Sequence, residues 1–207
     1  MIFSLCWAVA PRTGSGTEGG EWLVCKSGHH IHTLEGSCDK ALAAPGSEAA
    51  DGFQASVIHL RGQRQVVVVS FYGVSGVGWR GSNLRRFSKL GGLLRALRSP
   101  WLVLGDFNMP YTTLQRAGFL DRLNARVLQA DVASTCDASR AGSHIDYGLC
   151  SASCAPLLAG IRATAAVPWG THCGLVVELR VAQPHRHAAR GGAHLRRLSR
   201  HLTQYVD

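Results

Sequence analysis

Acidic residues, aromatic residues and long apolar segments are all scarce in this sequence. Its 207 residues include 13 Asp and Glu against 22 Lys and Arg, and only 7% are aromatic. No segment reaches the roughly 18 apolar residues of a membrane-spanning helix, so neither a helical membrane protein nor a membrane partner is expected. The formal net charge of +9 instead favours an anionic partner, with nucleic acid as the leading candidate, although simple solubility also explains a basic chain.

Paired cysteine motifs and a complete export signal are also missing. The seven cysteines show no repeated C-x-x-C spacing, and Cys150 and Cys154 match no zinc site. A reduced intracellular protein, nuclear or cytoplasmic, is therefore expected. The opening "MIFSLCWAVAPR" has a short apolar stretch but no positively charged n-region, so secretion is not expected.

What the sequence does contain is enough apolar material for one domain with many strands. Hydrophobic residues make up 46%, and 24 glycines separate short β-branched runs. We expect a domain over residues 1–181, followed by a basic, partly disordered tail over 182–207. The sequence gives no indication of an obligate protein partner.

Short apolar runs and helical periodicities predict a mainly β protein with a few helices. Strands are expected at residues 1–10, 21–26, 53–60, 65–73, 101–104 and 143–151, and residues 160–181 are expected to form a strand, a loop and a final strand. Helices are expected at residues 83–98, 112–118 and 120–128, and residues 29–52 are expected to form a loop. Because the run Val66–Val69 has no polar member, its strand is expected to be covered on both faces.

The helix predicted over residues 83–98 is strongly basic. Leucine and phenylalanine recur in it at three- and four-residue steps, and Asn83 is placed to cap its N-terminus. Its polar face carries Arg85 and Arg86, which are candidates for binding the phosphates of a substrate. The same face is also compatible with an ordinary solvated surface.

Polar residues follow or enter strands at four separate places. Asp106 and Asn108 come directly after the apolar run "WLVL", Tyr72 ends a strand, Asp146 lies in "SHIDYG" and His172 lies in "GTHCGL". Polar groups at strand ends can meet on one rim of a layered domain, however distant they are in sequence. An acid, an amide, a phenol and a histidine backed by a carboxylate suit phosphodiester cleavage.

Each of these residues also has a plainer interpretation. Asp106 and Asn108 favour turns, because their side chains bond to nearby backbone. Tyr72 fits ordinary strand packing, and His172 fits a buried core histidine. Trp169 lies shortly before His172, so it is a candidate for stacking on a substrate, or else a loop anchor.

In order and spacing, these segments resemble the endonuclease/exonuclease/phosphatase (DNase I-like) superfamily. The most specific is "GDFN" at 105–108, while "SHIDY" at 143–147 and "THCGLVV" at 171–177 resemble two later motifs and "VVSFYG" at 68–73 an earlier one. The resemblance covers about residues 1–181. It implies a four-layered α/β sandwich of two mixed, mostly antiparallel sheets flanked by helices, and a Mg²⁺- or Mn²⁺-dependent phosphodiesterase.

The resemblance also implies a role for each residue. Asp106 orients or activates the attacking water at or near the metal, and Asn108 holds the phosphate. Tyr72 contacts the phosphate, and His172 binds the scissile phosphate and stabilises the transition state. Asp146 hydrogen-bonds His172, which fixes its tautomer and favours the imidazolium.

Departures from the family pattern concern the metal. The family's first strand and its following Q-x-x-E strand, which carries the principal metal-binding Glu, have no counterpart, so the chain is expected to lack the first strand or strands of the fold. Glu18 and Glu21 are the substitutes available nearby, and Thr171 stands where the family has Asp. Asp106 is then the one implied metal residue, and Mg²⁺ or Mn²⁺ is expected to bind weakly.

The sequence thus leads to one principal function and two alternatives. The first is a metal-dependent phosphodiester hydrolase, nuclease-like and of retroelement origin, acting on nucleic acid with DNA favoured and with impaired catalysis. The second is a non-catalytic nucleic-acid-binding remnant of the same fold. The third is an inositol or lipid phosphatase relative.

Overall fold

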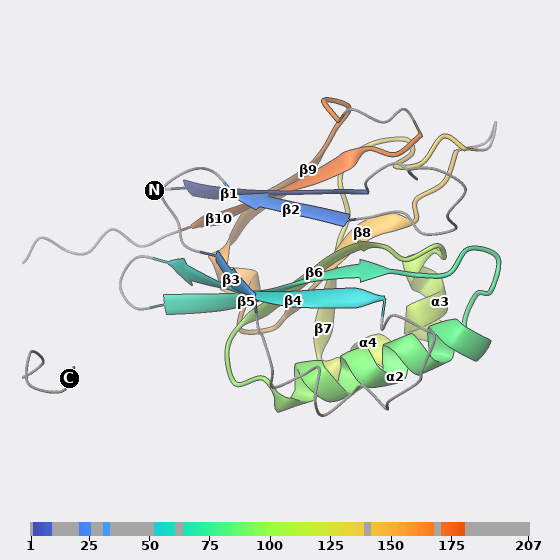
Figure 1. Ribbon diagram of the computed structural model, residues 1–207, viewed down its shortest axis with the longest axis horizontal. Coiled ribbons are helices and arrows are strands. Elements are labelled where there is room, and N and C mark those ends of the chain that lie inside the picture. Colours follow the sequence, from blue (N-terminus) through green and yellow to red (C-terminus); the bar gives the residue numbers. More distant parts are fainter. Residues whose placement is uncertain are drawn as a thin grey trace, which may run out of the picture.

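A computed structural model describes most of the chain between the first strand and residue 180 (Figure 1). The described residues are 2–9, 21–25, 31–33, 52–60, 64–138, 142–167 and 171–180. The predicted tail at 182–207, Glu18 and Trp169 lie outside these residues. In the described part, no helix has the length and apolar character needed to span a bilayer.

Two β-sheets face one another in the upper and middle parts of Figure 1. The first has four antiparallel strands in the order β2-β1-β10-β9. These strands are β1 (Ile2–Val9), β2 (Glu21–Cys25), β9 (Leu158–Thr164) and β10 (Gly174–Arg180). Every strand of this sheet was predicted from the sequence.

The second sheet has six strands in the order β3-β4-β5-β6-β8-β7. They are β3 (Ile31–Thr33), β4 (Phe53–Leu60), β5 (Arg64–Tyr72), β6 (Trp101–Asp106), β7 (Ala125–Leu128) and β8 (Asp146–Ser151). β5 and β6 run parallel, while all the other neighbours are antiparallel. The sheet is therefore mixed and mostly antiparallel, as expected.

Three helices cover the outer face of the six-stranded sheet (Figure 1). They are α2 (Gly81–Ala96), α3 (Tyr111–Arg116) and α4 (Phe119–Leu123), and a short 3-10 turn, η1 (Ala155–Leu157), precedes β9. The described residues thus form three of the four predicted layers, and a helical layer over the four-stranded sheet is not found among them. α2 is the crossover between the parallel strands β5 and β6, so it begins at the end of β5 and ends at the start of β6.

Side chains of the six-stranded sheet alternate between two cores. In β5, Val66 and Val68 pack between the sheets, while Val67 and Val69 pack under the helices. Such alternation follows from the two-residue period of a strand. The valine run is therefore covered on both faces, as the sequence predicted.

The start of α2 differs from the prediction. Asn83 is the third residue of the helix, rather than its N-cap, and it is fully buried. Its side chain accepts a hydrogen bond from the Val74 amide at 2.7 Å and donates to the carbonyls of Val74 and Gly78 at 3.0 Å each. Asn83 therefore fixes the loop that leaves β5 against the helix, because a buried amide needs these partners.

Two other segments were predicted wrongly. The helix expected over 120–128 ends at Leu123, because Asn124 adopts a left-handed conformation with φ of 47°, and β7 follows as an edge strand beside β8. The loop expected over 29–52 contains the three-residue strand β3, which pairs with β4. Neither short edge strand is long enough to show a clear two-residue period.

Candidate active site

Three of the predicted residues form one row across the end of the six-stranded sheet. Tyr72 of β5 is paired in register with Asp106 of β6, and Asp106 is paired with Asp146 of β8. Residues paired in this way project to the same side of a sheet. The sequence motifs at 72, 106 and 146 are therefore brought together by strand pairing alone.

Side chains along a strand alternate between the two faces of its sheet, and this alternation determines which face of the six-stranded sheet carries the row. In β6, Leu102 and Leu104 pack between the sheets, so Asp106 follows on the same side. In β8, Cys150 packs between the sheets, and Asp146 lies an even number of residues before it. The row therefore faces the four-stranded sheet, at the end where β10 begins.

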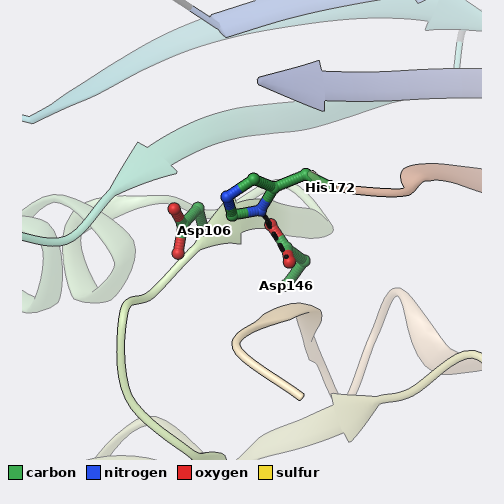
Figure 2. A group of neighbouring side chains, drawn as sticks. All are labelled: Asp106, Asp146 and His172. Atoms are coloured by element: carbon green, nitrogen blue, oxygen red, sulfur yellow. Dashed lines mark hydrogen bonds and ion pairs between the residues drawn. The ribbon is translucent and has the colours of Figure 1, made fainter. Parts of the chain in front are cut away.

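His172, which lies just before β10, reaches across to this row (Figure 2). Its Nδ1 lies 3.0 Å and 3.1 Å from the two carboxylate oxygens of Asp146. When Asp146 is ionised, Nδ1–H donates to the carboxylate, and Figure 2 shows the other ring nitrogen on the side of Asp106. The predicted His172–Asp146 pair is thus present, with Asp146 at the start of β8 and His172 in the segment that leads into β10.

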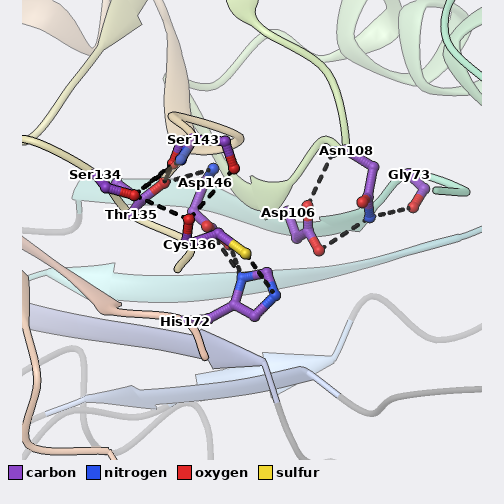
Figure 3. Close-up of polar contacts among 9 residues, drawn as sticks. All are labelled: Gly73, Asp106, Asn108, Ser134, Thr135, Cys136, Ser143, Asp146 and His172. Atoms are coloured by element: carbon purple, nitrogen blue, oxygen red, sulfur yellow. Dashed lines mark hydrogen bonds and ion pairs between the residues drawn. The ribbon is translucent and has the colours of Figure 1, made fainter. Parts of the chain in front are cut away.

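Asp106 is held in place by Asn108 (Figure 3). The Asn108 backbone amide donates to Oδ1 of Asp106, and its side-chain amide donates to Oδ2, each at 2.9 Å. The same side-chain nitrogen also donates to the Gly73 carbonyl at 2.8 Å. Both of its N–H groups are therefore used inside the protein, and Asn108 fixes the position of Asp106.

The backbone at Asn108 explains why an amide follows the acid. Asn108 has a positive φ of 50°, a region in which Asn is among the few tolerated residues besides Gly. This turn brings its side chain back to Asp106 and to Gly73. The turn interpretation and the site interpretation of "GDFN" therefore describe the same geometry.

Burial makes ionisation of the two carboxyls unfavourable. Asp106 and Asp146 are each 2% exposed. Burial, followed by the charge of Asp146, raises the pKa of Asp106 to about 7. Burial also raises the pKa of Asp146, although its hydrogen bond with His172 opposes the shift. The hydrogen bond with Asp146 raises the pKa of His172, which favours the imidazolium near neutral pH.

A loop residue that the sequence gave no reason to select completes the surroundings of His172. The Cys136 thiol lies 3.4 Å from Nε2 of His172 (Figure 3). Its neighbour Thr135 accepts a hydrogen bond from the Asp146 amide at 3.1 Å. Burial raises the pKa of the Cys136 thiol, so the thiol is protonated at neutral pH. No motif contains these two residues, so only the fold could identify them.

The acidic row and the histidine are also a possible cation site. One ligand atom each from Asp106, Asp146 and His172 all lie within 4.8 Å of one another. Thr171, which stands at a family Asp position, is exposed, and its carbonyl accepts a hydrogen bond from the Asp137 amide. The described site therefore offers two carboxylates and one imidazole, with no further charge from Thr171.

The two arginines predicted to bind substrate phosphates, Arg85 and Arg86, both lie on α2. Arg86 donates to the Tyr72 carbonyl at 2.8 Å, so this side chain joins α2 to the end of β5. Arg85 is exposed near the start of α2, toward the site end of the sheet, whereas Arg98 follows the other end of the helix. Arg85 and Arg86 therefore lie on the helix that covers the outer face of the six-stranded sheet, whereas the row faces the four-stranded sheet.

The two facing sheets, with helices over one of them, have the DNase I-like fold of several solved structures. One similar structure is the endonuclease domain of TRAS1, a telomere-specific non-LTR retrotransposon, with a TM-score of 0.60 and 16% identity over 86% of this chain and 81% of that chain. A second is the AP endonuclease LMAP from Leishmania major, with a TM-score of 0.57 and 15% identity over 86% of this chain and 71% of that chain. A third is the 3′-5′ exonuclease NExo from Neisseria meningitidis, with a TM-score of 0.53 and 18% identity over 84% of this chain and 79% of that chain.

These similarities confirm the fold that the sequence motifs implied. No protein-family model matches the sequence, and no curated protein matches it. At identities of 15–18%, the solved structures establish the arrangement of the chain and leave its activity to be inferred from the site.

The raised pKa of Asp106 predicts that this residue lowers stability at high pH. Because its folded pKa of about 7 exceeds the ordinary value of 3.8, the folded state binds the proton more tightly than the unfolded chain does, and stability falls as pH rises between these values. Asp106→Asn is expected to raise the free energy of unfolding at pH 8 by roughly 1–2 kcal/mol.

Urea unfolding of the wild type and Asp106→Asn at pH 8 and pH 4.5 measures this effect. The advantage of the variant should shrink at the lower pH, because there Asp106 is protonated in the folded state and the unfolded carboxyl, with its ordinary pKa of 3.8, is only partly ionised. A variant that is destabilised equally at both pH values would show that its hydrogen bonds matter more than its charge. Arg162→Ala, an exposed change on β9, serves as the control.

Proposed function

We propose that the protein is a metal-dependent phosphodiester hydrolase that acts on nucleic acid, with DNA as the favoured substrate. The observation that carries the proposal is the row of Tyr72, Asp106 and Asp146, with His172 bonded to its last member. An acid whose pKa lies near neutrality and an imidazole supported by a carboxylate are a suitable base and electrostatic partner for hydrolysis at a phosphate.

In the proposed reaction, Asp106 accepts a proton from the attacking water. The water oxygen forms the new bond to phosphorus, and the bond from phosphorus to the departing oxygen breaks. This oxygen leaves as an alkoxide and takes a proton from solvent water. His172, as the imidazolium, donates from Nε2 to a phosphate oxygen and stabilises the charge that develops there. Asp146 keeps Nδ1 protonated, Asn108 positions Asp106, and Tyr72 lies in the same row for contact with the phosphate.

A divalent cation fits this donor set. Two buried carboxylates lie close together, and the charge of Asp146 adds to the cost of ionising Asp106, which a cation would relieve. Mg²⁺ is commonly held by one or two carboxylates together with substrate phosphates. Asp106 would hold Mg²⁺ or Mn²⁺, which would supply positive charge at the phosphate. With Thr171 uncharged, we propose weak metal binding and impaired catalysis.

The charge of the chain supports a polynucleotide over a small phosphoester. The net charge is +9, and Arg85 lies exposed toward the site end of α2. Two structural neighbours are described as endonucleases and one as an exonuclease, and one of these is from a retrotransposon. We therefore propose a retroelement origin and an intracellular location as part of the same hypothesis.

A second candidate function is nucleic-acid binding without cleavage. The small number of charged ligands favours it, because Asp146 is already bonded to His172 and Thr171 adds no charge. In that case the basic surface would bind nucleic acid, and the row of Tyr72, Asp106 and Asp146 would catalyse no cleavage.

Incubation of the full chain with supercoiled plasmid and with an abasic-site duplex, in Mg²⁺ or Mn²⁺, tests the proposal. We expect metal-dependent cleavage that Asp106→Ala and His172→Ala abolish and that Arg162→Ala retains. Salt-sensitive DNA binding without any cleavage would replace the first function with the second. Release of phosphate from a phosphoinositide in preference to DNA cleavage would indicate the lipid phosphatase alternative instead.

A further inference from the structure

A groove between α2 and α4 is not used by the proposed hydrolysis. It has a volume of about 260 Å³ and is lined by side chains of both helices and of the segment that precedes α2. The two helices cover the outer face of the six-stranded sheet, whereas the row of Tyr72, Asp106 and Asp146 faces the four-stranded sheet. This α2–α4 groove is therefore separate from the candidate active site.

Aromatic rings that pack on one another form the floor of the groove. Phe87 of α2 and Phe119 of α4 meet edge to face with their ring centroids 5.2 Å apart, and the Trp79 ring lies 4.8 Å from Phe87. Phe87 and Phe119 are both buried, so their ring faces are already covered by protein. The floor is therefore apolar, but it offers little free ring surface on which a nucleic-acid base could stack.

A glycine in the middle of α2 brings the two helices together at the groove. Gly91 lines the groove, and a Cβ atom at this position would lie 3.2 Å from the Phe119 ring. Glycine inside a helix is destabilising relative to alanine, so its presence here is explained by this close approach. The shape of the groove is therefore built into the packing of α4 on α2.

The rim of the groove combines an exposed apolar side chain with two arginines. Leu84 is 43% exposed, one of only two large apolar side chains that are exposed in the described part of the chain. Arg95 of α2 and Arg122 of α4 are exposed, and none of the described residues that line the groove is acidic. Neither arginine forms an ion pair with any described residue. The groove is therefore complementary in charge to a ligand that carries carboxylates around an apolar group.

We propose that the α2–α4 groove is a docking site for an acidic, amphipathic peptide segment of a partner protein, which places an apolar side chain beside Leu84 and its carboxylates on Arg95 and Arg122. The volume of the groove lies just below the roughly 300–1,000 Å³ of small-molecule pockets, which suits one or two inserted side chains better than a whole small ligand. An amphipathic helix laid between two helices is a recurring mode of peptide recognition. The proposal goes beyond the proposed hydrolysis, because it concerns a partner and requires no phosphodiester substrate.

Fluorescence anisotropy with the full chain tests this site. The probe is a fluorescein-labelled helical peptide with tryptophan and leucine on one face and glutamates on the other. We expect a dissociation constant below about 100 μM, and Arg95→Glu/Arg122→Glu should weaken binding by about tenfold or more. The matched control Arg98→Glu/Arg116→Glu reverses two exposed arginines outside the groove and should bind within about twofold of the wild type. The indole N–H signal of Trp79 in NMR spectra, assigned with Trp79→Phe, should shift when the peptide is added.

Three results would overturn the proposal. They are a wild-type chain that does not bind the peptide, equal loss of binding in the two double variants, and equal binding of a control peptide whose tryptophan and leucine are replaced by alanine. A Trp79 signal that shifts with a single-stranded DNA oligonucleotide and not with the peptide would make the groove a nucleic-acid site instead.

A second variant tests the groove without any change of charge. Ser88 is exposed and lines the groove, so Ser88→Trp should fill it and weaken peptide binding, and unchanged binding would contradict the proposal. Circular dichroism checks that each variant is folded. The readout needs no cleavage, so absence of DNA cleavage would count against the proposed hydrolysis and leave the peptide result standing.

Discussion

Asp146→Asn is expected to reduce DNA cleavage at pH 8 by about 100-fold, provided that His172 acts as an imidazolium. The carboxylate is the main cause of the raised pKa of His172, through its hydrogen bond and then through its charge. Asparagine has nearly the same shape but no charge. Burial, which lowers the pKa of His172, would then dominate.

The direction of the pH effect distinguishes this mechanism from a general loss of structure. In the wild type, the raised pKa keeps His172 protonated to higher pH, so the basic limb of the rate profile lies above the ordinary histidine value. In Asp146→Asn the basic limb should move to lower pH. The acid limb, which Asp106 sets as the base, should also move to lower pH, because the charge of Asp146 no longer raises the pKa of Asp106. Part of the activity should therefore return when the pH is reduced below 8. The measurement is the cleavage rate from pH 5.5 to pH 9, together with the thermal stability of each variant.

Two controls make the result specific. His172→Ala should show no cleavage at any pH of the series, and Arg162→Ala should keep the wild-type profile. A uniform drop in rate with no movement of the limb would contradict the imidazolium role and leave Asp146 with a purely structural one.

The parts of this site that the sequence predicted are those carried by local motifs. Asp106 and Asp146 follow from short strings at strand ends, and their meeting follows from strand pairing that a fold resemblance can supply. His172 was likewise placed correctly beside Asp146. The hydrogen bonds of the Asn108 side chain could not be predicted from the sequence, because one of them depends on the position of the Gly73 carbonyl.

The parts that the sequence could not predict depend on contacts between distant loops. Cys136 belongs to no motif and lies 36 positions from His172, and their bridge forms only when the two sheets come together. Asn83 is of a residue type favoured at the N-cap of a helix, yet in the fold its side chain forms hydrogen bonds with the backbone of Val74 and Gly78. In both cases a polar side chain meets a partner that local periodicity does not encode.

Gly105→Ala is expected to destabilise the protein by about 3 kcal/mol, because the backbone leaves no room for a side chain at the glycine of "GDFN". Gly105 pairs with Phe71 across the parallel strands β5 and β6. A Cβ atom at this position would lie 2.2 Å from the Phe71 carbonyl oxygen and 3.0 Å from its carbonyl carbon. These are backbone atoms at the centre of a sheet, so the two strands must separate to admit even a methyl group.

Separation at this point would also disturb the site, since the next pair along the strands is Tyr72 with Asp106. The matched control is Gly92→Ala in α2, where a new Cβ meets nothing within 4 Å and where alanine should stabilise the helix by up to about 1 kcal/mol. Urea unfolding of both variants measures the difference, and the cleavage assay shows whether Gly105→Ala also loses activity. If Gly105→Ala unfolded within 0.5 kcal/mol of the wild type, the close approach of β5 and β6 would not be what holds Asp106 in its row.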